Sequence, residues 1–313
     1  MTLFKNQNEK ISIVKDMPFS LEKDLQKLTE KNIKEIFGLE FVSSEFQHND
    51  LRIDTLAYDR NLNTFVVLEY KREKSFSVID QGFAYLSLIL NNQAEFVLEF
   101  NKKFEEKRGK ADFDWSQMKV LFLTRSFTAH QLEAINFKDL PIELWEVTRY
   151  EGDLIQYSQI KKSGAKASIE SLGINNNDVK NVSREVKSYS EEDYLNSKPD
   201  GIGKKLFELL KEKVLVVDSS IVMNPTKSYI SFQLPNNWRN IFYCHVYGSK
   251  LKIDFTRSEP KDFNDPEKKV IYNENSIKHY GQHISYIEID NEKGLDYGLY
   301  IIQQAYDKFM KEN

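Results

Sequence analysis

One run of eight residues, TFVVLEYK at Thr64–Lys71, constrains the fold of this chain most. Its first residues are apolar on both faces, which is typical of a buried strand. Glu69 and Lys71 then share one face, because side chains two residues apart lie on the same side of a strand. Charged side chains are costly at the end of a buried strand unless they have partners or a function. The pattern therefore indicates a central strand whose carboxyl end is functional.

A second strand-like run, 51–58, precedes it, and the short polar loop 59–63 between the two favours a β-hairpin. In such a pair Asp54 comes close to Glu69. Two carboxylates supply the hard oxygen ligands of Mg²⁺ or Mn²⁺, and Lys71 can stabilise phosphate charge or orient a water. The sequence therefore predicts a metal site facing a phosphodiester, with ordinary solvated surface charges as the alternative.

The surrounding pattern predicts an α/β domain with the element order α-β-β-β-α-β-α-β. The expected elements are a helix at 20–37, strands at 39–46, 51–58 and 64–71, a helix at 77–91, a strand or short helix at 95–100, a strand at 119–124, a helix at 128–137 and a strand at 142–150.

Three side chains on these expected helices can reach the same strand end. Glu22 lies at the border of the buried stripe of the first helix, from where its carboxylate could approach the metal; stabilisation of the helix N-terminus is the alternative. Gln81 and Tyr85 stand four residues apart on one face of the helix that follows Lys71. They can contact a phosphate, a base or a catalytic side chain, although such pairs also occur on plain helix surfaces.

The segments Arg52-Ile53-Asp54, Leu68-Glu69-Tyr70-Lys71 and Gln81-x-x-x-Tyr85, after a helical acid at Glu22, resemble the PD-(D/E)XK nuclease superfamily. The family has a restriction-endonuclease-like αβββαβ core, and the resemblance is greatest to its NucS-like branch. It covers about residues 18–125. Ile53 stands where the name-giving proline would be, a departure that is common in the family.

The resemblance implies a divalent-metal-dependent endonuclease that hydrolyses nucleic-acid phosphodiesters, with DNA as the expected substrate. By residue, it implies catalytic roles for Asp54, Glu69, Lys71 and Glu22, metal binding by Asp54, Glu69 and Glu22, and substrate positioning by Gln81, Tyr85, Arg52 and Arg72. The alternative functions are a catalytically inactive nucleic-acid-binding protein and a protein-interaction protein on the same fold.

A change of composition divides the chain. The stretch 161–198 has no Phe or Trp and is rich in Ser, Asn and charge, which predicts a linker between a nuclease-like domain at 1–160 and a second domain at 199–313. The second domain is expected to be α+β with an antiparallel sheet. Its expected elements are a helix at 203–213, strands at 214–217, 228–234, 241–247, 250–256 and 285–289, and a helix at 295–310.

The second domain resembles a domain of unknown function that is common in bacterial relatives of such proteins, and the resemblance implies no chemistry. Aromatic side chains recur along its strands, namely Tyr229, Phe232, Trp238, Phe242, Tyr243 and Tyr247. They suit either a stacking surface for bases or a hydrophobic core, and the surrounding alternation favours the core for most of them.

Composition excludes several classes of protein. With 44 Lys and Arg against 48 Asp and Glu, the formal charge of −4 rules out a strongly basic protein that coats nucleic acid. A single cysteine, Cys244, excludes an internal disulfide and a four-cysteine zinc site. Apolar runs are too short to span a bilayer, which predicts a soluble, cytoplasmic protein with no membrane partner. A homodimer is left open, because cutting two strands takes two sites.

Overall fold

The computed structural model describes residues 2–19, 21–48, 51–71, 77–137, 140–161, 182–183, 185–186, 188–235 and 239–312. The chain divides into two compact units, Met1–Ser188 and Tyr189–Asn313. Most of the predicted linker, 161–198, lies outside the described residues. Helix α7 (Glu191–Asn196) falls inside that range, and its Tyr194 is buried in the core of the second unit.

The first unit is built on a seven-stranded mixed sheet with the order β3-β8-β7-β6-β5-β4, in which β9 also pairs with β8. Strands β4, β5 and β6 form an antiparallel meander, whereas β6, β7 and β8 are parallel. The bounds are β3 (Asp16–Met17), β4 (Glu40–His48), β5 (Leu51–Asp59), β6 (Thr64–Lys71), β7 (Lys119–Thr124), β8 (Ile142–Tyr150) and β9 (Ile155–Ile160).

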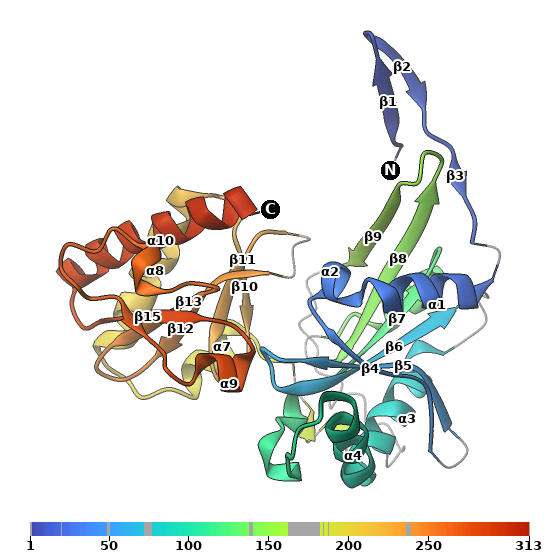
Figure 1. Ribbon diagram of the computed structural model, residues 1–313, viewed down its shortest axis with the longest axis horizontal. Helices are drawn as coiled ribbons and strands as arrows, with labels where there is room; N and C mark the ends of the chain where they lie inside the picture. The colour runs from blue at the N-terminus through green and yellow to red at the C-terminus, as the bar shows by residue number, and fades with distance from the viewer. Residues whose placement is uncertain are drawn as a thin grey trace. The chain divides into compact units, whose positions relative to one another are not determined.

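Helices cover both faces of this sheet (Figure 1). One face packs against α1 (Glu22–Lys31) and α2 (Ile33–Phe37) through a cluster that includes Leu25, Ile33 and Leu68. The other packs against the helices of the β6–β7 crossover and the one after β7. These are α3 (Val78–Asn91), α4 (Gln93–Phe104) and α5 (Ala129–Ala134).

The predicted αβββαβ core is thus present, and the predicted α/β fold class, a mixed sheet followed by a separate antiparallel one, is confirmed. Two details differ from expectation. The helix expected at 20–37 is two helices divided at Asn32, and the stretch at 95–100, expected as a strand or short helix, belongs to the 12-residue α4.

The N-terminal strands β1 (Phe4–Gln7) and β2 (Lys10–Ile13) form a separate two-stranded sheet that no sequence pattern predicted. Every residue in both strands is exposed, so neither strand shows the alternation of buried and polar side chains by which strands are recognised.

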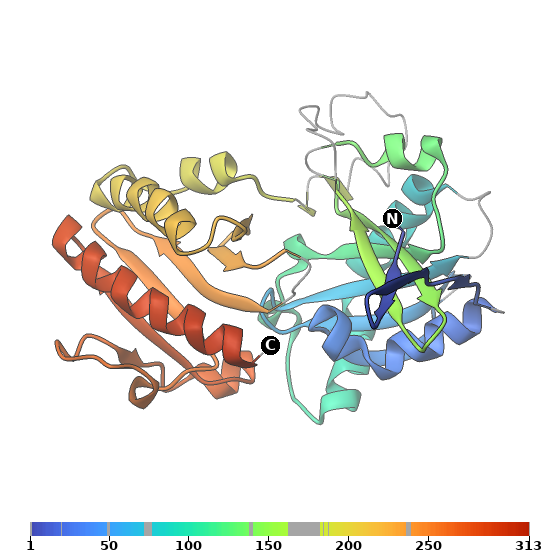
Figure 2. The same cartoon turned by 90° about the horizontal axis from the view of Figure 1, so that it is seen from above.

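The second unit holds a six-stranded antiparallel sheet with the order β10-β11-β12-β13-β15-β14. Helices α8 (Ile202–Val217) and α10 (Glu292–Glu312) pack against one of its faces (Figure 2). The remaining elements are β10 (Val222–Pro225), β11 (Ile230–Gln233), β12 (Asn240–Val246), β13 (Leu251–Thr256), β14 (Ile271–Tyr272), α9 (Ser276–Tyr280) and β15 (Ile284–Ile289).

The strand expected at 214–217 is wrong, because these residues form the last turn of α8. Val214 is buried there in the same cluster as Leu206 and Leu210. The β-branched run VLVV has strand propensity, but burial of the apolar stripe of α8 overrides it.

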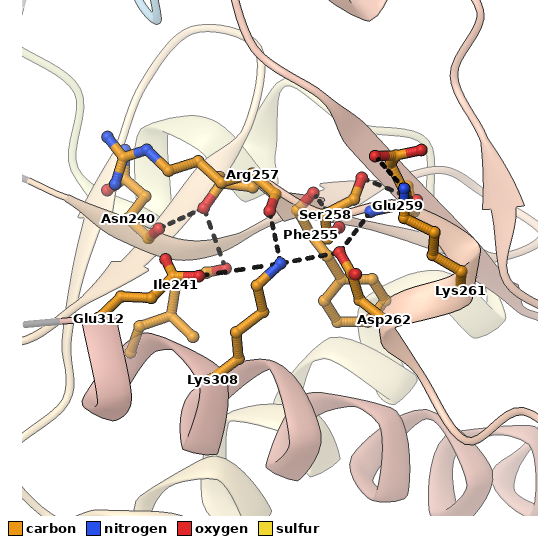
Figure 3. Close-up of polar contacts among 12 residues, drawn as sticks. Asn240, Ile241, Phe255, Arg257, Ser258, Glu259, Lys261, Asp262, Lys308 and Glu312 are labelled. Atoms are coloured by element: carbon orange, nitrogen blue, oxygen red, sulfur yellow. Dashed lines mark hydrogen bonds and ion pairs between the residues drawn. The ribbon is translucent and has the colours of Figure 1, made fainter.

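Lysine 308 of α10 holds the turn that follows β13 (Figure 3). Its Nζ donates to the main-chain oxygen of Arg257 at 2.9 Å and to Asp262 Oδ2 at 2.7 Å. Arg257 has a φ of 49°, so the turn is sharp and gains from a fixed partner. The side chain of Lys308 therefore ties the end of α10 to the sheet.

We expect Lys308→Met to lower the free energy of unfolding by roughly 1 kcal/mol, since a charged hydrogen bond and a partly exposed ion pair are lost. Urea titration measures the change. Lys311→Met, an exposed lysine in the same helix, is the matched control and should leave the midpoint unchanged. Equal effects of the two substitutions would contradict the assigned role of Lys308.

Candidate active site

The candidate site lies at the carboxyl end of β6. This strand is central, since it pairs with β5 on one side and β7 on the other, and its first seven residues are buried. Glu69 is only 3% exposed, although it is a carboxylate. Buried carboxylates are rare without partners, so the contacts of Glu69 define the site.

Three side chains surround the Glu69 carboxylate. Lys71 Nζ lies 2.7 Å from Oε1, and the Gln81 amide donates to the same oxygen at 2.9 Å. The Tyr85 hydroxyl donates to Oε2 at 2.8 Å. These hydrogen bonds fix the orientation of the carboxylate and compensate its burial.

Helix α3 delivers the last two of these side chains. Ser77 caps the N-terminus of this helix, because its side chain accepts a hydrogen bond from the main-chain amide of Asp80. The helical spacing places Gln81 and Tyr85 on one face. The Gln81 amide also lies 2.9 Å from the Tyr85 hydroxyl. Burial, and next the charge of Glu69, raise the pKa of Tyr85, so the hydroxyl keeps its proton and remains a donor.

Asp54 lies on β5 next to Thr55, which pairs with Leu68 of β6. Its Oδ2 accepts a hydrogen bond of 3.1 Å from the main-chain amide of Tyr70. Burial, and next the negative charge of Glu69, raise the pKa of Asp54 from 3.8 to about 6. The β5–β6 pair therefore brings the two predicted carboxylates near enough for the charge of Glu69 to raise the pKa of Asp54.

The other predicted site residues have no contact with the Glu69 carboxylate among those described above. Glu22 is exposed on α1, one turn before Gln26. The Arg52 side chain is 62% exposed and lies 3.1 Å from Glu45 Oε2, while its main-chain oxygen lies 3.2 Å from the Tyr85 hydroxyl. Arg72 falls outside the described residues.

Sequence reasoning missed Gln26. This α1 side chain is only 4% exposed, and its amide lies 2.8 Å from the main-chain oxygen of Asp54, 3.1 Å from Ser44 Oγ and 2.9 Å from Glu30 Oε1. It ties α1 to the strand that carries Asp54. Its spacing of four residues after Glu22 was the one available signal, because a lone glutamine in a helix otherwise indicates surface.

Glu45 was missed as well. It lies within β4 with a φ of 55°, which departs from regular strand geometry. The alternation of apolar and polar residues in the sequence does not reveal this departure. Its carboxylate pairs with Lys23 and Arg52. The charge of Glu45 also contributes to the raised pKa of Asp54, so Glu45 lies near the candidate site.

A divalent cation fits the chemistry of this donor set. Among the described residues, no group of three His, Cys, Asp and Glu side chains is placed to hold a metal ion, so Glu22 does not complete a set with Asp54 and Glu69. Magnesium is commonly bound by one or two carboxylates together with water and substrate phosphate, and two carboxylates are what β5 and β6 supply.

Comparison with known proteins identifies a relative that spans nearly the whole chain. No protein-family model matches the chain. An uncharacterized protein of Haemophilus influenzae is 37% identical over 305 residues, which are 97% of this chain and 99% of that protein. The chain belongs to the same family as this Haemophilus protein.

Two solved structures show distant likenesses. A repair endonuclease from Pyrococcus abyssi matches 42% of this chain and 49% of its own, with a TM-score of 0.23 and 17% identity. An EndoMS–dsDNA complex matches 47% of this chain and 64% of its own, with a TM-score of 0.23 and 13% identity. The chain thus spans less than two thirds of either structure.

No helix in the described part of the chain is both long and apolar enough to cross a membrane.

Proposed function

We propose that the first unit is a divalent-metal-dependent nuclease that hydrolyses phosphodiester bonds of nucleic acid, with DNA as its substrate. One observation carries the proposal: Asp54 and Glu69 meet at the β5–β6 end, and Glu69 is held by Lys71, Gln81 and Tyr85. Burial, and next the charge of Glu69, raise the pKa of Asp54, and carboxylates perturbed in this way are typical of functional sites.

Asp54 and Glu69 would hold Mg²⁺ or Mn²⁺. When bound, such an ion activates a water molecule and neutralises charge on the phosphate. Lys71, on the same face of β6 as Glu69, orients the nucleophile or stabilises the charge that develops on the phosphate oxygens. Glu22, which is exposed on α1, assists metal binding through a water molecule.

Gln81 and Tyr85 are positioning residues in this proposal, because they act through Glu69. Arg52, largely exposed beside the site, supplies a cation for the nucleic-acid backbone, and Arg72 is assigned the same role from sequence alone. A homodimer, in which two copies of the site face two strands, and a cytoplasmic location both stay predictions.

The experiment that tests the proposal is incubation of the pure protein with single-stranded and duplex DNA, with Mg²⁺ or Mn²⁺ and with EDTA. We expect new ends only when the divalent cation is present. Metal binding at the site without cleavage of any DNA or RNA substrate would contradict a nuclease.

Tyr85→Phe is expected to weaken metal binding about 10–100-fold, the usual effect of removing a side chain that hydrogen-bonds a metal ligand. The substitution removes only the hydroxyl that donates to Glu69 Oε2. Calorimetric titration with Mn²⁺ measures it, and Tyr300→Phe, at an exposed tyrosine of α10, is the matched control. Unchanged affinity in Tyr85→Phe would remove Tyr85 from the site.

A second candidate function has its own supporting observation. Glu69 Oε1 already accepts hydrogen bonds from Lys71 and Gln81, so its charge is compensated without a metal. This arrangement suits a catalytically inactive nucleic-acid-binding protein. Such a protein would bind DNA, keep that binding in Glu69→Gln, and release no products with any metal.

A further inference from the structure

The sheet of the second unit has two faces of different character. Phe242 and Cys244 of β12 are buried in the cluster beneath α8 and α10. Because side chains alternate along a strand, Tyr243 and His245 lie on the opposite face. The same alternation on β13 puts Ile253 and Phe255 in the core and the neighbouring Lys252 and Asp254 on that opposite face; β15 places Tyr286 and Glu288 there as well.

The strand register aligns these side chains in two rows across the sheet. Tyr243 pairs with Asp254, which pairs with Tyr286. His245 pairs with Lys252, which pairs with Glu288. The face opposite α8 and α10 therefore carries aromatic rings and ionisable groups. Tyr243 and Asp254 are buried on it, whereas Tyr229, His245, Lys252 and Tyr286 are partly exposed. Tyr280 of α9 lies close enough to Asp254 and Lys252 for their charges to affect its pKa.

Asp254 lies at the centre of this arrangement. Its side chain is 8% exposed, and it lies 3.0 Å from His245 Nε2 and 2.8 Å from Lys252 Nζ. Burial opposes ionisation, but the hydrogen bond from His245 and the charge of Lys252 hold the pKa of Asp254 below its usual value. The buried carboxylate thus fixes two nitrogen-bearing side chains next to each other on the sheet.

Aromatic rings flank this pair on both sides. The Tyr229 ring lies 4.7 Å from that of Tyr243 and 5.6 Å from that of His245. On the far side, Lys252 Nζ lies 4.3 Å from the centre of the Tyr286 ring. Glu288, at the end of its row, is paired with Lys250 at 2.7 Å, so its charge is compensated.

We propose that the partly exposed side chains of Tyr229, His245, Lys252 and Tyr286, which surround the buried Tyr243 and Asp254, bind single-stranded nucleic acid. Bases stack on the Tyr229 and Tyr286 rings, and a backbone phosphate lies against Lys252 and His245 between them. An ammonium group has three N–H donors, so Lys252 keeps hydrogen-bonding capacity beyond Asp254. Flat rings combined with cationic donors are the means by which proteins bind single strands without reading sequence.

A single strand fits better than a duplex, because the bases of a duplex are stacked on each other and cannot reach the rings. The surface is separate from Asp54 and Glu69, so it adds a second nucleic-acid contact and does not depend on the proposed nuclease activity.

The test is fluorescence anisotropy of the full chain with a labelled 15-mer of thymidine, in EDTA so that no strand is cut. We expect Tyr286→Leu and Lys252→Met each to weaken binding about tenfold. Lys252→Met should also lower the salt slope, log Kd against log salt, by about 0.7, the value for one phosphate contact on a single strand.

Tyr300→Leu and Lys311→Met on α10, which packs on the other face of the sheet, are the matched controls and should bind as wild type. No binding by the wild-type chain, or equal affinity of the test and control variants, would overturn the proposal.

A second measurement needs no substitution. A single strand carrying 5-iodouracil, cross-linked by light to the wild-type protein and mapped by mass spectrometry, should label peptides with Tyr229 or Tyr286. Labels confined to the first unit would overturn the proposal even if a variant had failed to fold.

Discussion

Glu69→Gln is expected to lower the rate of metal-dependent DNA cleavage about a thousandfold. The substitution keeps the size of the side chain and one oxygen for Tyr85, but removes the charge that would bind a cation and that now pairs with Lys71 at 2.7 Å. Loss of metal-based charge stabilisation is worth several kcal/mol in the transition state, and about 1.4 kcal/mol corresponds to tenfold in rate. Single-turnover cleavage with excess protein measures the chemical step.

Glu95→Gln, at an exposed acid of α4, is the matched control and should cleave at the wild-type rate. Circular dichroism and thermal unfolding establish that both variants fold. Residual activity of Glu69→Gln within tenfold of wild type would mean that Glu69 is not at the reacting centre.

Asp54→Asn is expected to stabilise the metal-free protein at pH 7 by up to about 3 kcal/mol. The pKa of Asp54 is raised in the folded state from 3.8 to about 6, a difference of roughly two units at about 1.4 kcal/mol each. Ionised Asp54 therefore costs folding free energy above about pH 6, and asparagine avoids that cost while still accepting the amide of Tyr70.

The sign of the pH dependence follows from the same values. Since the folded state binds the proton more tightly, the penalty in wild type is full above about pH 6 and is lost as the pH falls towards 3.8. Urea titrations in EDTA at several pH values between 4 and 8 measure it. The advantage of Asp54→Asn should shrink as the pH falls. Asp153→Asn, at an exposed aspartate, should show no such trend, and an advantage that stays constant with pH would contradict the raised pKa.

The centre of the first unit was predictable because its signals are local. The run 65–68 is apolar on both faces, and the loop 59–63 joins its strand to a second one, so the β5–β6 hairpin and the proximity of Asp54 and Glu69 were predictable. Helical spacing alone put Gln81 and Tyr85 on one face of α3.

The rest of the site depends on tertiary packing and could not be predicted. Gln26 is polar yet buried, and only the crossing of α1 over β5 brings its amide to the Asp54 main chain. Glu45 has a positive φ and pairs with Lys23 and Arg52. The alternation of apolar and polar residues along a strand cannot reveal such a position. Glu22, assigned from its place beside the buried stripe, is exposed, because α1 turns that residue towards solvent.

The central claim is that Asp54 and Glu69 form one metal site, and calorimetric titration of the pure protein with Mg²⁺ and Mn²⁺ tests it most directly. Wild type, Asp54→Ala, Glu69→Ala and the control Glu95→Ala are titrated side by side, with folding verified for each. The account predicts binding by wild type and Glu95→Ala and loss of binding in both site variants. Metal binding that survives in both Asp54→Ala and Glu69→Ala would contradict it.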